Sequence, residues 1–370
     1  MADRLKQIAL HTMGSIAPQA SSLGSIIKEL TLEEKVSLLA GKDFWTTNAV
    51  PRLGVPSLKV SDGPNGARGE AFKGGVKSAC FPACVSLAAT FDKGLARHIG
   101  KALAEETRTK GATVLLGPTV CPHRDPRGGR NFESFSEDPL LAGELAAEYI
   151  NGLQAEGVGA TIKHYAANES ETKRFTIDAE VSARALREIY LKPFEIAVKK
   201  SDPWALMTSY NLVNGTHADS NEFLIRKVLR EEWGFKGLIM SDWGGVNSTA
   251  ESLNAGHDLE MPGPASWRTV AKVAEAIKKG KLTEATLNGR VKKVLELLER
   301  TGKFDDPTIP EEKAVDKASH RELIRRAGAE GMVLLKNEAM FCLSGWISSS
   351  RWLWLAYPKN SLGMAEALPP

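Results

Sequence analysis

The sequence predicts an α/β fold, a TIM-type barrel in which eight parallel strands each lead into a helix. Short apolar runs alternate along the 370 residues with amphipathic stretches of helical spacing, the order expected of parallel strands joined by helical crossovers. The apolar runs also stop at polar residues that are followed by Gly, Pro and Asn. In such a barrel the carboxyl ends of the strands and their loops form the active-site face. We therefore expect these polar residues to converge on one pocket.

Six apolar runs are expected to be strands. They end near Val60, Leu116, His164, Ser209, Asp242 and Glu260. The polar residues at or after the first five ends are Asp62, Arg124, Lys163, His164, Tyr210 and Asp242. A single Asp after a strand is ordinary turn chemistry, but that explanation would have to hold independently at every end. Residues 84–90 (CVSLAAT) and 331–337 (GMVLLKN) are expected to supply the two remaining strands.

Amphipathic stretches separate these runs. The expected helices cover residues 92–111, 136–157, 182–200 and 222–235. Gly111 stands where a C-terminal glycine cap is common, and Ser136 is the candidate N-cap of the second helix, with Pro139 in its first turn. Pro193 is expected to bend the third helix, because proline lacks the amide proton that a helix interior requires.

Composition argues against several classes of protein. With 42% hydrophobic and 25% charged residues and a net charge of +3, the chain lacks the basic surface of a nucleic-acid or membrane binder. No apolar run is long enough to span a bilayer. The first 22 residues lack a secretory apolar core, so a cytoplasmic location is expected, with secretion as the alternative. The sequence does not predict an oligomeric state.

The four cysteines do not suggest a metal site. Cys80, Cys84, Cys121 and Cys342 lack the paired spacing of zinc ligands, so free thiols are expected. The sequence also lacks dinucleotide and phosphate-binding glycine motifs, a GxSxG elbow and an HExxH motif. We expect neither a metal nor an organic cofactor.

The polar residues at the strand ends suit a sugar. Charged side chains bind hydroxyl groups, and the apolar face of a pyranose stacks on an indole. Asp242 is the best candidate for a glycosidase nucleophile, with Arg124, Lys163 and His164 expected to help keep it ionised. Trp243 is either a sugar contact or a packed anchor of its loop, and we weigh the two equally.

Three acids in "FESFSEDP" resemble catalytic groups by eye. Glu133, Glu137 and Asp138 are better explained by capping of the helix that follows, since acids are common at helix N-termini. Asp258 and Glu260 either support the pocket floor or lie behind the residues that line it, and they are not counted among the site residues.

The motifs together resemble the N-terminal barrel of glycoside hydrolase family three, and within it fungal-type β-glucosidases. The stretches that show the resemblance are "SDGPNGARG", "GPTVCPHRDPRGGRNFESFSEDP", "ATIKHYAANESE", "MTSYNLVNGTH" and "GLIMSDWGG" followed by "AGHDLEMPGP". The likeness extends from about Leu23 to Glu338. It implies a retaining β-glucosidase that releases terminal glucose, with cellulose and other polysaccharides as the distant source of its substrates.

The resemblance also implies residue roles. The nucleophile is Asp242, the Asp of the Ser-Asp-Trp motif. The implied substrate-binding residues are Asp62, Arg68, Arg124, Lys163, His164, Met207, Tyr210 and Trp243. Met207 is of a type more often found in a core, but its place beside Tyr210 in the motif favours the site. No cofactor is implied, and the expected partner is a β-glucoside or an oligosaccharide.

The sequence departs from the family pattern in two places. Cys121 and Arg127 replace an Asn and a Leu in the loop that contains Arg124, so the hydrogen bonds of that loop are expected to differ. Residues 339–370 do not resemble the second, α/β sandwich domain of two-domain members, which supplies the proton donor. We therefore assign no acid/base, and we expect a tail at 1–22, a barrel at 23–338 and an aberrant, poorly packed tail at 339–370.

Two functions remain open from the sequence. One is a β-glucosidase of the family type; the other is a truncated sugar-binding barrel with an incomplete site. Single-domain relatives that cut N-acetylhexosaminides have a His-Asp loop, which "KHYAANESE" lacks, so that subclass fits poorly.

Overall fold

The computed structural model describes residues 23–336 and 338. The chain divides into two compact units, Met1–Gly331 and Met332–Pro370. The expected tails at 1–22 and 339–370 lie outside the described residues. In the part of the chain that is described, no helix has the length and apolar character needed to cross a membrane.

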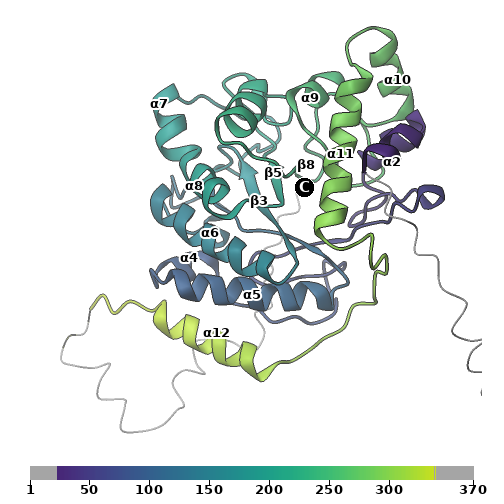
Figure 1. Ribbon diagram of the computed structural model, residues 1–370. Coiled ribbons are helices and arrows are strands. Elements are labelled where there is room, and N and C mark those ends of the chain that lie inside the picture. The colour runs from purple at the N-terminus through teal and green to yellow at the C-terminus, as the bar shows by residue number, and fades with distance from the viewer. Residues whose placement is uncertain (1–22, 337, 339–370) are drawn as a thin grey trace, which may run out of the picture. The chain divides into compact units, whose positions relative to one another are not determined.

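A parallel sheet forms the centre of the first unit (Figure 1). Its strands follow the order β1 (Val60–Asp62), β2 (Val114–Leu116), β3 (Gly159–Tyr165), β5 (Ala205–Thr208) and β8 (Leu238–Ser241). Val60 pairs with Val114, and Met207 with Met240, so the carboxyl ends of the strands lie at one edge. A separate small sheet contains β4 (Asp178–Ala179), β6 (Leu212–Val213) and β7 (Thr216–His217).

Short bridges continue the sheet beyond β8. Met240 pairs in parallel with Leu259, Glu260 with Ala40, and Thr46 in antiparallel fashion with Lys59 just before β1. The expected strand end at Glu260 therefore lies in the ring. The chain has the α/β fold with a parallel sheet of a barrel domain, but part of its ring is made of single bridges.

The two additional strands expected from the sequence were wrong. Residues 84–90 begin with the helix α4 (Cys84–Ala88), and residues 332–336 form neither helix nor strand. Cys84, Leu87 and Ala88 are the buried residues of α4. Their spacing is helical, and a short apolar run cannot be assigned from its hydrophobicity alone.

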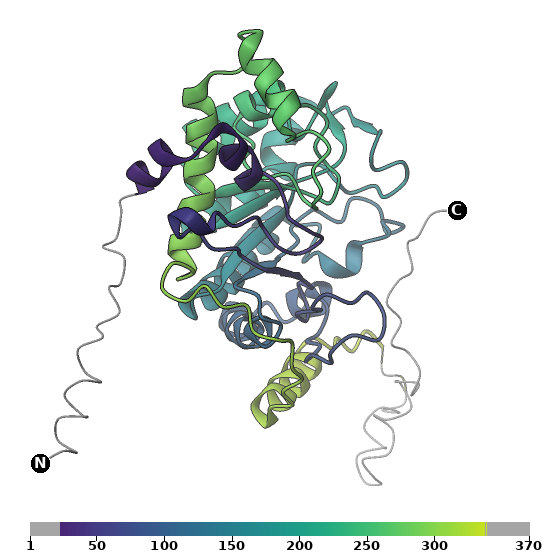
Figure 2. The same cartoon turned by 90° about the vertical axis from the view of Figure 1, so that its right-hand side faces the viewer.

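Helices surround the central strands. They are α2 (Leu23–Glu29), α3 (Leu32–Leu38), α4, α5 (Lys93–Thr109), α6 (Pro139–Ala155), α7 (Ala183–Ala185), α8 (Lys192–Ser201), α9 (Ala250–Ala255), α10 (Val270–Lys278), α11 (Glu284–Arg300) and α12 (Ala318–Glu330), with 3₁₀ turns η1 (Pro51–Leu53) and η2 (Asn131–Glu133) and π-helical segments η3 (Leu186–Tyr190) and η4 (Phe223–Glu232). In Figure 1, α5, α6 and α8 lie on one side of the strands and α11 on the other, and a 90° turn again shows strands between helices (Figure 2).

The helix boundaries mostly follow the sequence signals. Gly111 has a φ of 64° after α5, and the third expected helix is interrupted between η3 and α8, where Pro193 lies in the first turn of α8. Ser136 is not the N-cap of α6. Asp138 is, because its carboxylate accepts from the amides of Leu140 and Leu141.

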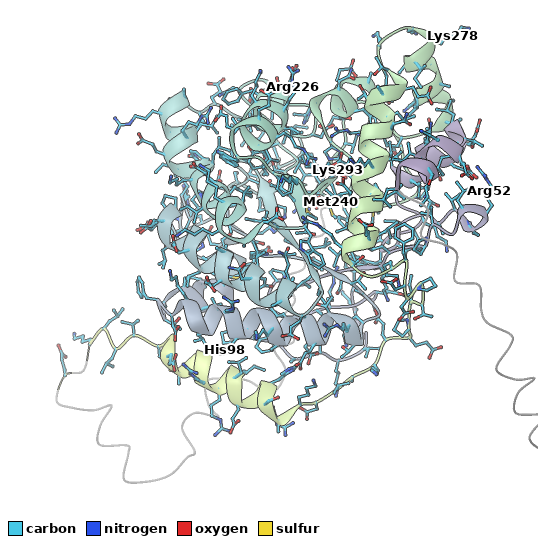
Figure 3. The ribbon with its side chains drawn as sticks, viewed as in Figure 1. Arg52, His98, Arg226, Met240, Lys278 and Lys293 are labelled. Carbon is cyan, nitrogen blue, oxygen red and sulfur yellow. The ribbon has the colours of Figure 1, made fainter. Side chains whose placement is uncertain are left out.

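Alternation along the strands separates two cores. Leu115, Ile162 and Leu206 pack against the helices α5, α6 and α8, whereas Met207 and Met240 belong to a second core that also includes residues of α3, α10 and α11. Figure 3 shows Met240 in the interior and Arg226 and Lys278 at the outer edge. Since side chains alternate along a strand, Asp62 and Asp242 continue the inward rows that contain Val60 and Met240.

Two glycines allow α5 and α6 to pack closely. A Cβ added to Gly152 would lie 2.1 Å from the carbonyl oxygen of Arg97, and one added to Gly100 would lie 2.2 Å from that of Tyr149. In contrast, a Cβ on Gly289 in α11 would meet no atom within 4 Å.

We predict opposite effects for alanine at these glycines. Gly152→Ala should lower the free energy of unfolding by about 1–3 kcal/mol, because two backbones must separate. Gly289→Ala should raise it by about 0.5–1 kcal/mol, because alanine favours a helix interior. Urea unfolding followed by circular dichroism measures both. Equal effects of the two substitutions would contradict the close packing of α5 on α6.

Candidate active site

An ion pair joins the ends of two strands that are not neighbours. Lys163 of β3 donates from Nζ to Oδ1 of Asp62 on β1 at 2.7 Å, and the side chain of Lys163 is only 3% exposed. Burial alone would raise the pKa of Asp62. The Lys163 charge and hydrogen bond outweigh it, so the pKa of Asp62 lies below its ordinary value. Asp62 is therefore a fixed anion at neutral pH.

Asp242 follows β8 and is 9% exposed. Its Oδ1 accepts from the amide of Trp243 at 2.7 Å, Oδ2 lies 3.5 Å from Nε2 of His164, and the Tyr210 hydroxyl, which donates to the Trp243 carbonyl oxygen, adds to the forces that lower its pKa. Burial raises the pKa of Asp242 above the ordinary value, and the charges of Arg130 and Lys163 oppose this rise only in part. The result is a carboxylate of increased basicity with one oxygen held by a backbone donor.

His164 faces the same carboxylate as a neutral ring. Burial, followed by the charge of Arg130, lowers its pKa well below the usual range. The expectation that a charge on His164 helps keep Asp242 ionised was therefore wrong, because burial and the nearby cations disfavour the imidazolium. His164 adjoins Asp242 as an uncharged ring.

The loop between β2 and α6 brings Arg130, not Arg124, to this cluster. Nη2 of Arg130 lies 3.3 Å from Nε2 of His164. Arg124 is exposed, and its side chain hydrogen-bonds to Tyr190. An irregular loop has no period from which side-chain direction can be predicted, so the sequence did not distinguish these two arginines. The Gly-Gly pair before Arg130 was the available signal, since it permits a close approach.

The substitutions in this loop have identifiable contacts. Cys121 donates from Sγ to the carbonyl oxygen of His164 at 3.5 Å, so it fastens the loop to the end of β3. Arg127 lies at the surface in an ion pair with Asp125. Burial raises the pKa of the Cys121 thiol to about 12, which keeps it protonated.

Arg174 is a second residue that sequence reasoning missed. Its guanidinium carbon lies 4.9 Å from the centre of the Tyr210 ring, and Nη1 donates to Oε2 of Glu171 at 2.7 Å. The Tyr210 hydroxyl is 3.2 Å from the carbonyl oxygen of Trp243. Arg174 therefore orders the side of the site formed by Tyr210. The i,i+3 spacing of Glu171 and Arg174 was the signal.

Aromatic rings lie beside Arg68 and Trp243. Phe44, Trp45, Phe72 and Trp243 contact one another through their rings. The Trp243 indole donates to the carbonyl oxygen of Phe44 at 2.9 Å, so it anchors its loop. Arg68 lies over the Phe72 ring at 4.2 Å, and its Nη2 is 4.0 Å from Asp62.

Met207 of β5 is 1% exposed and packs in the same core as Met240. It lies one residue beyond the Ile162–Leu206 pair, as Lys163 does on β3, and Lys163 is itself 2% exposed. Burial and depth therefore do not separate Met207 from the other site residues, and its contact with a substrate stays a prediction.

Asp258 and Glu260 are structural: Asp258 pairs with Arg230 and Arg290, and Glu260 accepts from three backbone amides.

A small, partly open pocket adjoins the cluster. Its lining includes Arg130, His164 and Glu169, but neither Asp62 nor Asp242. Burial raises the pKa of Glu169 to about 8, and Oε1 of this residue has no hydrogen-bond partner among the residues that the structure describes. Within residues 23–336, no three His, Cys, Asp or Glu side chains are grouped to hold a metal ion.

Known proteins share this sequence and geometry. A family model described as the glycosyl hydrolase family 3 N terminal domain matches residues 10–297. Beta-glucosidase B of Emericella nidulans is 65% identical over 318 residues, which are 86% of this chain and 38% of the relative. A beta-glucosidase of Rhizobium radiobacter is 54% identical, with coverage of 87% and 39%. The chain thus spans less than two fifths of the length of these relatives.

Solved structures agree. The beta-glucosidase of Kluyveromyces marxianus in complex with glucose matches with a TM-score of 0.83 and 43% identity, over 86% of this chain and 39% of that one. Beta-glucosidase 3B of Thermotoga neapolitana in complex with α-D-glucose matches with a TM-score of 0.81 and 42% identity, over 86% and 48%. The fold, the order of the motifs and the family match lead to one conclusion: this chain belongs to glycosyl hydrolase family 3, through its N-terminal domain.

Proposed function

We propose that the site is that of a retaining β-glucosidase, in which Asp242 attacks the anomeric carbon of a terminal, non-reducing β-D-glucosyl unit. The observation that supports this most directly is the buried Asp242 carboxylate, with Trp243 donating to one oxygen and His164 near the other. The glucose complexes of related β-glucosidases agree with a sugar ligand. Cellobiose is a proposed natural substrate, which would connect the chain to cellulose degradation.

The proposed reaction has two steps. Oδ2 of Asp242 forms a bond to the anomeric carbon while the bond to the leaving oxygen breaks; that oxygen departs as a phenolate or alkoxide, and a covalent glycosyl-enzyme results. Water then attacks the same carbon, breaks the ester bond to Asp242, loses a proton to solvent and releases glucose with retained configuration. The fixed charges of Asp62 and Lys163 suit hydrogen bonds to the sugar hydroxyls, and the raised pKa of Asp242 suits a nucleophile once it is ionised.

The proton donor is not assigned in the described part of the chain. There, the groups that interact with Asp242 are Arg130, Lys163, His164, Tyr210 and Trp243, none of which is a carboxyl group. Asp62 remains ionised beside Lys163 and is a poor donor. This favours a second candidate function, a sugar-binding barrel that turns over slowly or not at all.

Leaving groups of different acidity separate the two functions. We predict that the chain forms a covalent adduct on Asp242 with an activated fluoro-sugar whose leaving group is an acidic phenol. Such a phenol leaves with little protonation, so the adduct does not require a proton donor. Cellobiose turnover should stay near background, because a general acid typically contributes about 10²–10⁴-fold. Peptide mass spectrometry locates the adduct, and glucose release measures turnover.

The control is Asp242→Asn, which should stay folded and form no adduct. Rapid cellobiose hydrolysis would reveal a proton donor within the chain, with the carboxyl groups nearest the site as the first candidates. If the wild-type chain is folded but forms no adduct, the β-glucosidase proposal is rejected and the sugar-binding function is supported.

Adduct formation should depend on pH. It requires ionised Asp242, so its rate should fall on the acid side at a pH above the ordinary Asp pKa of about 3.9. Lys163→Met should move this acid limb to still higher pH, because the Lys163 charge lowers the pKa of Asp242. Lys278→Met, at the outer edge of the molecule, is the control and should leave the limb in place. A downward shift for Lys163→Met would oppose the assignment of Asp242.

Substitution of the two arginines of the β2–α6 loop, Arg124 and Arg130, should affect the rate of adduct formation differently. Arg130→Ala should slow adduct formation by about 10- to 100-fold, as expected for hydrogen bonds to charged groups. Arg124→Ala should change it by less than about twofold, because Arg124 is exposed and bonded to Tyr190. The second-order rate constant for the fluoro-sugar measures both. If Arg124→Ala lowers this rate constant more than Arg130→Ala does, the prediction that Arg124 binds the substrate would be supported instead.

A further inference from the structure

We propose that Glu133 is a positioning residue, which fixes the Arg130 guanidinium next to His164 and Asp242. This inference rests on the proposed glycosidase function. Glu133 is one of the three acids that were expected to cap α6, and for this residue the expectation was wrong. It acts on the reaction only through Arg130.

Glu133 is buried, and its two carboxylate oxygens contact different residues. The residue is 7% exposed, Oε1 lies 2.5 Å from Nε of Arg130, and Oε2 accepts from Oγ1 of Thr119 at 3.2 Å. Thr119 lies in a parallel bridge with Lys163, and the neighbouring amide of Val120 donates to the Lys163 carbonyl at 2.9 Å. Glu133 therefore links Arg130 to the strand-end framework that also positions Lys163.

Capping does not explain this residue. Asp138 already caps α6, and Glu133 lies in η2, before that cap. A buried carboxylate is costly unless it is paired, so its contacts with Arg130 and Thr119 account for its place. Glu137, four residues further along, is exposed and provides a matched control.

Arg130 transmits the effect to the site. The charged and polar groups that face it are Glu133, Glu171 at 3.9 Å, His164 at 3.3 Å and Asp242. Its charge favours the ionised form of Asp242 and disfavours the charged form of His164. Lys163 and Tyr210 also face Asp242, and Lys163 and Arg174 add to the charge near His164. If Arg130 moved away, both equilibria would shift.

The test compares Glu133→Ala, Glu133→Gln and Glu137→Ala by adduct formation with an activated fluoro-sugar across pH. Glu133→Ala frees Arg130, so the maximal rate constant should fall by about 10- to 100-fold, as displacements near 1 Å do, and the acid limb should move to higher pH. Glu133→Gln retains an acceptor for Arg130 and removes a negative charge. It should recover most of the rate, and its acid limb should stay or move to lower pH. Glu137→Ala should match wild type.

A second measurement does not need catalysis. NMR titration should show a rise in the pKa of His164 in Glu133→Ala but not in Glu133→Gln or Glu137→Ala, because only the first releases Arg130. If wild type forms no adduct, the proposed function fails while this titration still decides the role of Glu133. The proposal is overturned if alanine and glutamine at position 133 shift the acid limb or the His164 titration alike, in proportion to their loss of thermal stability.

Discussion

The ion pair between Lys163 and Asp62 is the contact on which the rest of the site depends. It joins β3 to β1 across the intervening strand β2, so it can form only where the sheet curves enough to bring the two ends together. Breaking such a partly buried pair leaves an uncompensated charge, which is strongly destabilising. The pair therefore helps define the curvature of the sheet and, with it, the distance between the first and third strand ends. Asp242 enters from β8 toward the space that this curvature encloses.

The sequence predicted those parts of the site that strand alternation determines. Asp62, Lys163 and Asp242 each follow an apolar run, and parallel strands align their carboxyl ends, so the convergence of these residues follows from period and direction. Met207 obeys the same alternation, and it lies one residue beyond the Ile162–Leu206 pair, as Lys163 does. Its contact with a substrate stays a prediction.

The residues that were predicted wrongly lie mainly in segments without a regular hydrophobic period. Arg124 and Arg130 share one irregular loop, and the side chain that points inward is selected by Glu133 and Glu171, residues that the sequence did not connect with an arginine. Residues 84–90 failed for a different reason, because an apolar run of that length satisfies a helix and a strand equally. Tertiary packing under η2 and α6 decided in favour of the helix α4.

The distribution of charge in the site is consistent with the proposal that Asp242 is the nucleophile. Each nearby cation has a carboxylate of its own: Lys163 pairs with Asp62, Arg130 with Glu133, and Arg174 with Glu171. Each of these cations thus makes its closest ion pair with a carboxylate other than Asp242. Asp242 consequently receives a diffuse positive field rather than a direct ion pair, and burial raises its pKa despite that field. A carboxylate fully engaged by a cation would be a stable anion with little nucleophilicity. An anion that is surrounded by cations but paired with none retains its reactivity toward a carbon that becomes positively charged.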